Sequence, residues 1–166
     1  SHTTLSGWLD VLEASFIICR LQPYFANIGK RLVKTPKIYF TETGLAACLL
    51  GLKTVDQVSR DPLRGNLFEN LVVSDLLKRN LNRDAEDELF FFRTSDGIEV
   101  DVLRKTEKGL QPIEIKSAMT WTESLADGLR RVRKLIPDAI DPTIIYCGST
   151  YPAASGDIAR INFLNG

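Results

Sequence analysis

Two short segments place acidic and basic residues at a spacing that suits metal binding or catalysis: I-E-V-D at residues 98–101 and I-E-I-K at residues 113–116. Successive side chains of a β-strand point to opposite faces, so Glu99 shares a face with Asp101, and Glu114 shares one with Lys116. If the two strands pair, we expect these charges on one side of a sheet and apolar side chains such as Val102 on the other. Burying such charges costs stability, whereas carboxylate oxygens suit Mg²⁺.

A fourth acidic residue, Glu69, lies in a predicted helix over residues 63–81, where it falls among valine and leucine side chains. A carboxylate in apolar surroundings needs a partner or a metal ion, or its pKa rises. Gly65, four residues earlier, permits a close approach of backbone on the same side. We therefore expect Glu69 to reach the charged face of the sheet.

The four positions together predict metal-dependent hydrolysis of a phosphodiester. Asp101 and Glu114 would bind Mg²⁺ or Mn²⁺ with the main-chain carbonyl of Ile115, and Glu69 would support the ion through water or hold a second ion. Lys116 would orient or deprotonate the attacking water, and the metal would polarise the phosphoryl oxygen. Two alternatives stay open: charges that alternate along a solvated strand, and an internal ion-pair network without catalysis.

The spacing of apolar residues predicts the elements that position these groups. Helices are expected at residues 3–13, 44–50, 63–81 and 122–136, and strands at 16–21, 37–41, 89–93, 98–104, 110–116, 143–147 and 158–164. This order predicts an α/β protein. The polar stretch 53–62 is the candidate boundary between a partial winged-helix-like segment, residues 1–60, and a second domain, residues 61–166, with the order α-β-β-β-α-β.

This second domain resembles the PD-(D/E)xK nuclease superfamily, and most closely its branch of archaeal Holliday-junction resolvases. The resemblance is carried by the motifs at residues 65–69, 98–101 and 113–116. It implies a restriction-endonuclease-like core in which Glu69 is the helix glutamate, Asp101 the metal aspartate, and Glu114 and Lys116 the E-x-K pair. Val100 stands where the proline that names the superfamily would be.

A second resemblance covers nearly the whole chain. Motifs at residues 37–40, 43–45, 65–70, 92–94, 99–101 and 113–116 are similar to the C-terminal uncharacterised domain of a prokaryotic family of AAA-type ATPases. Glu42 replaces the aspartate that is usual in that family. The resemblance implies that a P-loop ATPase domain precedes this chain in the longer protein. The module would then be either a DNA nuclease or a catalytically inactive module that binds DNA or protein and regulates the ATPase.

Basic residues outside the charged motifs have two readings each. A run on the helix after the E-x-K strand either binds phosphates or forms a solvated helix face: Arg130, Arg131, Arg133 and Lys134. A second group either resembles a DNA-contacting wing or lies in an ordinary loop: Lys30, Arg31, Lys34 and Lys37. Arg93 either contacts phosphate or pairs with Glu69 or Asp101.

The composition narrows the classes of function. The net charge is zero, so the chain lacks the strongly positive charge that favours nucleic-acid binding, and DNA binding would depend on local basic patches. His2 is the only histidine, which argues against a histidine zinc site or a Ser-His-Asp triad, and no nucleotide-binding glycine motif occurs. No apolar run approaches the roughly 20 residues of a membrane helix. We expect a cytoplasmic protein that could form a homo-oligomer through a sheet edge.

Overall fold

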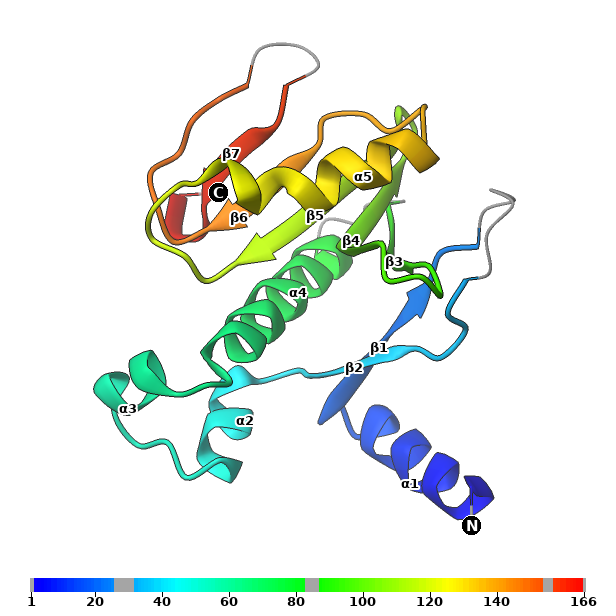
Figure 1. The fold of residues 1–166 in the computed structure, drawn as a ribbon. Coiled ribbons are helices and arrows are strands. Elements are labelled where there is room, and N and C mark those ends of the chain that lie inside the picture. The colour runs from blue at the N-terminus through cyan, green and yellow to red at the C-terminus, as the bar shows by residue number, and fades with distance from the viewer. Residues whose placement is uncertain (1, 26–31, 83–86, 154–156, 166) are drawn as a thin grey trace.

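The strands of this protein join one mixed sheet. The computed structural model describes residues 2–25, 32–82, 87–153 and 157–165. Within them, seven strands lie in the order β2-β1-β3-β4-β5-β6-β7. Their bounds are β1 Ile18–Pro23, β2 Lys37–Phe40, β3 Glu88–Arg93, β4 Glu99–Thr106, β5 Gly109–Lys116, β6 Thr143–Tyr146 and β7 Ala159–Asn162. The helices are α1 His2–Ala14, α2 Thr43–Leu49, α3 Val55–Arg60, α4 Arg64–Asn82 and α5 Asp127–Leu135 (Figure 1).

The centre of the sheet is an antiparallel meander of β3, β4 and β5. The turn between β3 and β4 contains Gly97 at φ 87°, a conformation that favours glycine. Beyond β5, strands β6 and β7 are parallel to it, and α5 makes the crossover from β5 to β6. On the other edge β1 runs parallel to β3 and pairs with β2 in the antiparallel sense. The meander makes β4 and β5, the strands with the acidic motifs, direct neighbours.

Two helices cover the two faces of the sheet (Figure 1). On one face α4 packs through Val72, Val73 and Leu76 onto a core that includes Val102 and the two isoleucines of β5. On the other face α5 packs through its own apolar stripe, Leu129 and Val132, onto a second core. Residues three and four positions apart lie on one side of a helix, which explains why each helix has a single buried stripe. The predicted α/β class is confirmed.

A β-bulge changes the predicted facing of β4. Phe90 pairs with Leu103 and Phe92 with Val100, so two residues of β4 stand opposite one residue of β3. Val100 and Leu103 therefore both lie under α5, whereas Val102 lies in the core under α4. The prediction that Val100 and Val102 share the face opposite Asp101 was wrong for Val102, because the bulge interrupts the alternation.

Most predicted elements are present with ends shifted by a few residues, and two differ in kind. The polar stretch 53–62 contains the helix α3, which begins with a capping box between Thr54 and Gln57. The predicted helix 122–136 is a 3₁₀ turn, Glu123–Ala126, followed by α5. Both segments carry helical signals in their sequences, but helices of this length are marginal on their own, so these signals predict them only weakly.

Strands from both predicted domains lie in the same sheet, since β1 pairs with β3. The boundary near residue 60 stays a prediction, because strand pairing alone does not decide how a chain divides into folding units. In the part of the chain that the structure describes, every helix is too short or too polar to cross a membrane.

Candidate functional site

Asp101 lies where the β4–β5 ladder stops. The last ladder pair on that side is Val102 with Ile113. Just beyond it, the backbone N–H of Ile115 donates a hydrogen bond of 2.8 Å to Asp101 Oδ2. Asp101 is buried. Burial and the nearby charges of Glu114 and Glu69 together raise the pKa of Asp101 to about 7, while Lys37 and the Ile115 hydrogen bond act to lower it. This carboxyl group is therefore poised between its charged and neutral forms near neutral pH.

Glu114 is buried on the α5 side of β5, because its neighbours Ile113 and Ile115 pack under α4. Lys116 Nζ lies 2.5 Å from Glu114 Oε1. The second oxygen, Oε2, is buried and has no hydrogen-bond partner among the described residues. Burial raises the pKa of Glu114, while Lys116 acts to lower it. One carboxylate oxygen thus faces the interior unsatisfied.

A glycine on α5 makes room for the Glu114 carboxylate. A Cβ atom at Gly128 would lie 3.3 Å from Glu114 Oε1 and 3.5 Å from Oε2. The contact at 3.3 Å is tight, so a side chain at residue 128 would require the Glu114 carboxylate to shift by a few tenths of an ångström. The glycine therefore gives the carboxylate room beside the first turn of α5.

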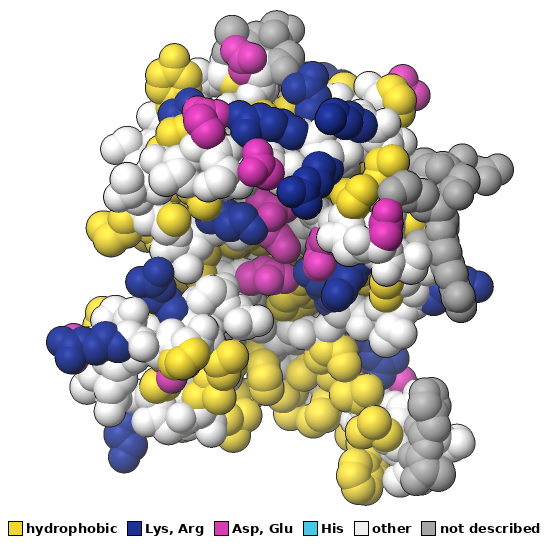
Figure 2. Space-filling view, in the orientation of Figure 1, with side chains coloured by type: hydrophobic (Ala, Val, Ile, Leu, Met, Phe, Trp, Pro, Cys, Tyr) yellow, Lys and Arg dark blue, Asp and Glu magenta, His cyan; other side chains and the backbone are white. Residues whose placement is uncertain are grey.

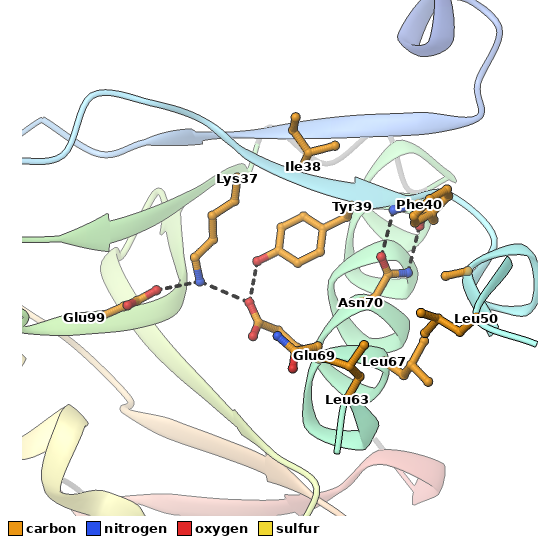
Figure 3. Close-up of a pocket in the computed structure, with 12 residues that line it drawn as sticks. Lys37, Ile38, Tyr39, Phe40, Leu50, Leu63, Leu67, Glu69, Asn70 and Glu99 are labelled. Carbon is orange, nitrogen blue, oxygen red and sulfur yellow. Dashed lines mark hydrogen bonds and ion pairs between the residues drawn. The ribbon is translucent and has the colours of Figure 1, made fainter. Parts of the chain in front are cut away.

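Glu69 projects from the second turn of α4 toward strand β2 (Figure 3). Tyr39 donates a hydrogen bond of 2.6 Å through its hydroxyl to Glu69 Oε1, and Lys37 Nζ donates to the same oxygen at 3.1 Å. Burial and the charge of Glu69 raise the pKa of the Tyr39 hydroxyl. Glu69 is thus held by two groups of β2 that the sequence analysis did not assign to the site.

Lys37 is the centre of this acidic group. Its Nζ lies 2.7 Å from Glu99 Oε1 and 3.1 Å from Glu69 Oε1 (Figure 3). The distance from Nζ to Asp101 Oδ1 is 3.7 Å. Burial acts to lower the pKa of Lys37, but the surrounding carboxylates outweigh it and the pKa is raised. The ammonium group therefore stays charged and serves as a counter-ion for carboxylates from α4 and β4.

An asparagine fixes β2 to α4 and so places Lys37. Asn70 Oδ1 accepts a 2.7 Å hydrogen bond from the backbone N–H of Phe40, and its Nδ2 donates to the Phe40 carbonyl at 2.9 Å. The same amide also donates to Thr43 Oγ1 at 2.9 Å. Because Lys37 and Tyr39 are two residues apart on a strand, both then point to Glu69.

A groove leads to this group from the surface. It has a volume of about 470 Å³ and runs between β2, α2 and the start of α4, with Lys37, Tyr39, Glu69 and Glu99 in its lining (Figure 3). Figure 2 shows acidic side chains near the middle of the view with lysine and arginine side chains around them. The acidic group is accessible from outside.

The charges of the site do not balance. Four carboxylates, Glu69, Glu99, Asp101 and Glu114, face three cationic groups: the ammonium groups of Lys37 and Lys116 and the guanidinium group of Arg93, which pairs with Glu99. Among the described residues, no group of three acidic, histidine or cysteine side chains is arranged ready to hold a metal ion. The site is instead two adjoining ion-pair groups, one around Lys37 and one at Lys116. The Asp101–Ile115 hydrogen bond joins them.

The four predicted site residues lie in one region, but the expectation that the charges of β4 and β5 share one face of the sheet was wrong. Glu114 lies on the α5 side, whereas Asp101 shares Lys37 with Glu69 of α4. The negative charges of Glu114, Asp101 and Glu69, in decreasing order of effect, raise the pKa of Lys116. Burial acts to lower this pKa but is outweighed. Whether Asp101, Glu114 and Glu69 bind a metal stays a prediction. Sequence reasoning missed Tyr39, Asn70 and Gly128. The spacing of Lys37 and Tyr39 on a predicted strand was the available signal.

The basic residues that the sequence analysis left with two interpretations have different surroundings in the structure. Lys37 belongs to the acidic site, so assigning it to an exposed wing or loop was wrong; Lys34 is exposed, and Lys30 and Arg31 lie outside the described residues. Arg93 pairs with Glu99 at 3.5 Å. On α5, Arg130 is exposed and pairs with Glu123 and Asp127.

Comparison with known proteins gives families whose functions are unknown. A family described as "Domain of unknown function (DUF8612)" matches residues 1–56. Two uncharacterised proteins, from Mycobacterium bovis and Mycobacterium tuberculosis, are each 32% identical to the chain over 130 residues, which is 78% of this chain and 28% of each relative. The chain thus aligns with less than a third of the length of these relatives. No solved structure matches. Residues 64–164, which contain the acidic motifs of α4, β4 and β5, match the family described as "Domain of unknown function (DUF4143)", and the chain belongs to that family.

Proposed function

We propose that this chain is a metal-dependent phosphodiester hydrolase module, a DNA nuclease with a restriction-endonuclease-like core. From α4 onward the elements follow the order helix, three strands, helix, strand, as the resemblance to PD-(D/E)xK nucleases implies. The observation that carries the proposal is the buried and unpartnered Oε2 of Glu114, beside the hydrogen-bonded Asp101. A buried carboxylate oxygen without a partner is costly, and a cation would satisfy it.

The residues present fit a hard divalent cation. Asp101 and Glu114 would hold it with the carbonyl oxygen of Ile115, and Glu69 would support it through water, all of them oxygen donors of the kind that Mg²⁺ and Mn²⁺ prefer. When all four carboxylates are ionised, they exceed the three cationic groups Lys37, Lys116 and Arg93, and this leaves negative charge for the ion to offset. When bound, the ion supplies Lewis acidity at the phosphoryl oxygen and a more acidic water.

The protein's own groups would do the rest. Lys116, held 2.5 Å from Glu114, orients the attacking water and offsets charge at the scissile phosphate. Lys37 lies against Glu69, Glu99 and Asp101, where it competes electrostatically with an incoming cation. We therefore propose that Lys37 moves away from Asp101 when the site is loaded, while it remains paired with Glu99.

A second candidate is a catalytically inactive module that binds DNA or protein and regulates an attached ATPase. The observation that favours it is Lys37 itself, because an ammonium group already serves three of the four carboxylates. In the longer proteins the module would follow a P-loop ATPase domain. The chain covers 28% of its relatives, so most of their length lies elsewhere.

The test is cleavage of single- and double-stranded DNA with Mn²⁺ or Mg²⁺, for the parent chain, Glu114→Gln and Glu107→Gln. Glu107 lies exposed in the turn between β4 and β5 and gives the matched change in charge. Cleavage should need the metal and fall at least a hundredfold in Glu114→Gln alone. Equal cleavage by the parent and Glu114→Gln would assign the activity to a contaminant. Absence of both cleavage and thermal stabilisation by millimolar Mn²⁺ would favour the regulatory module.

A further inference from the structure

The guanidinium group of Arg160, on β7, lies over two aromatic rings. Its guanidinium carbon lies 4.0 Å from the centre of the Trp121 ring and 4.8 Å from the centre of the Tyr151 ring. Both rings are anchored. Trp121 packs edge-on against Tyr146 and donates a hydrogen bond to Glu123, and Tyr151 exchanges two backbone hydrogen bonds with Arg160. Cation–π contacts with two anchored rings restrict the position of the guanidinium group.

The guanidinium group keeps its donors. Its N–H groups all point within its plane, and no side-chain hydrogen bond of Arg160 is formed in the part of the chain that the structure describes. Its Nε is buried without a hydrogen-bond partner among the described residues. A cavity of about 370 Å³ opens beside it, lined also by Arg130, Arg133, Glu123 and Asp157. Of these carboxylates, Glu123 is paired with Arg130. The cavity therefore offers an arginine fork of restricted position in a site where cations outnumber anions.

The position of Arg160 relates it to the acidic site. Glu114 pairs in register with Ile144 on β6, and Ile144 pairs with Arg160 on β7. Residues paired in this way point to one face of a sheet, and neighbouring strands are about 4.8 Å apart. Arg160 thus lies about 10 Å from Glu114 on the same face. Phosphates along one DNA strand follow every 3.4 Å or so of helix axis and lie farther apart than that through space, because the strand winds around the axis, so this separation corresponds to roughly one or two nucleotides.

We infer that Arg160, held against Trp121 and Tyr151, binds a backbone phosphate of the nucleic-acid strand whose neighbouring phosphate enters the acidic site. Guanidinium groups bind phosphate through two parallel N–H···O bonds, which a restricted position of the group favours. The inference rests on the proposed function for the identity of the ligand as nucleic acid. It does not depend on cleavage, because the arginine acts on a phosphate that is not cut.

The experiment measures binding of a fluorescein-labelled DNA duplex by anisotropy, in EDTA and over a range of salt concentrations. The variants are Arg160→Met, Arg160→Lys and the control Lys108→Met. Lys108 is exposed in the β4–β5 turn, at the other end of β5 from Lys116, and its loss gives the same change in charge. Arg160→Met should weaken binding about tenfold for every sequence and lower the salt slope by about one. Arg160→Lys should restore the slope but not the full affinity, and Lys108→Met should change neither.

Several results would overturn the inference. Parent-like binding and salt slope in Arg160→Met would do so, as would an equal loss in Lys108→Met, which would reflect net charge alone. Failure of the parent to bind the duplex at low salt would also overturn it. A nucleoside monophosphate that competes as strongly as the duplex would assign the pocket to a free nucleotide. Retained binding by Arg160→Lys excludes misfolding as the cause. If Arg160-dependent binding is found without any cleavage, the inference stands and the hydrolase proposal fails.

Discussion

Lys37 and Lys116 lie in the same site but have different surroundings. Lys37 lies against the carboxylates of Glu69, Glu99 and Asp101, whereas Lys116 contacts one oxygen of Glu114, whose other oxygen has no partner among the described residues. The group around Lys37 is thus satisfied without a metal, and the group at Lys116 is not. The difference suggests that Lys37 is a resident counter-ion and that Lys116 borders the position where chemistry takes place.

The two lysines also reach the site in different ways. Lys116 is two residues from Glu114 on one strand, so local geometry alone places them together. Lys37 is 32 residues from Glu69 in the sequence, and Asn70 helps to place it there by binding the backbone of β2. Any displacement of β2 would change the charge around Asp101. Strand β2, which belongs to the predicted first domain, therefore influences the acidic site in the predicted second domain.

The largest effect is expected from Asp101→Asn, because Asp101 joins the two groups. We expect the affinity for Mn²⁺ to fall at least a hundredfold and cleavage to be lost, since a charged oxygen ligand is removed. Without metal, the free energy of unfolding at pH 8 should be equal or higher, because repulsion by Glu114 and Glu69 ends. Calorimetric titration with Mn²⁺ and urea unfolding check both parts. A strong loss of metal-free stability would show that Asp101 is a structural acceptor only.

Lys116→Met tests the open side of the comparison. We expect cleavage to fall by about a hundredfold or more, because the group that serves the water is lost, while the affinity for Mn²⁺ changes little. The measurement is single-turnover cleavage at saturating Mn²⁺, with metal affinity measured separately. A large loss of metal affinity with unchanged cleavage at saturation would reverse the assigned role.

Lys37→Met tests the satisfied side with the same change in charge. Removal of the resident counter-ion should raise the affinity for Mn²⁺ by about tenfold, since one fewer cation competes for Asp101. The metal-free protein should lose about 1–2 kcal/mol of unfolding free energy, because the carboxylates of Glu69 and Glu99 lose a donor. Thermal unfolding with and without Mn²⁺ reports both quantities. Weaker Mn²⁺ binding in this variant would contradict competition.

The raised pKa of Asp101 predicts two opposite pH dependences. The stability of the metal-free protein should decrease as pH rises, whereas the stabilisation by bound metal should increase. The folded pKa is about 7 and the ordinary value is 3.8, so between these values the folded state binds more protons than the unfolded state. Stability without metal should therefore decrease as pH rises from about 4 to 7, by at most about 1.4 kcal/mol per pH unit from this group. Glu114, whose pKa is also raised, acts in the same direction.

Urea unfolding in EDTA from pH 5 to pH 8 measures this slope, and Asp101→Asn should reduce it. With Mn²⁺ present, stabilisation by the metal should grow over the same window, since the ion binds the charged carboxylate. Lys37 and Lys116 contribute no slope there, because their raised pKa values lie above 10.5. A slope that Asp101→Asn leaves unchanged would mean that another group titrates.

The smallest effect is expected from Tyr39→Phe. Glu69 loses one hydrogen bond but keeps Lys37, so the free energy of unfolding should fall by about 1 kcal/mol. Tyr24→Phe is the matched control, since Tyr24 contributes a ring contact with Phe90, and its change should stay within about 0.5 kcal/mol. Equal unfolding midpoints for parent and Tyr39→Phe would show that the Tyr39–Glu69 bond adds nothing to stability.

Features that depend on neighbouring residues were predicted from the sequence, whereas features that depend on contacts between distant segments were not. The long helix α4, the three central strands and the pairing of Glu114 with Lys116 follow from apolar spacing and strand alternation, which are properties of neighbouring residues. The facing of Val102 did not, because a bulge depends on how two strands pair. The close fit of Gly128 to Glu114 also escaped prediction, since it requires the distance between a helix and a sheet.

By itself the sequence determined an α/β chain with acidic residues on one helix and two adjacent strands, because periodicity and spacing are written in consecutive residues. Only the tertiary structure decided that Lys37 enters the acidic group and that one oxygen of Glu114 is buried without a partner. Both depend on how distant segments pack, which sets the burial and the counter-ions of each charge. The electrostatic balance of the site therefore belongs to the fold rather than to its motifs.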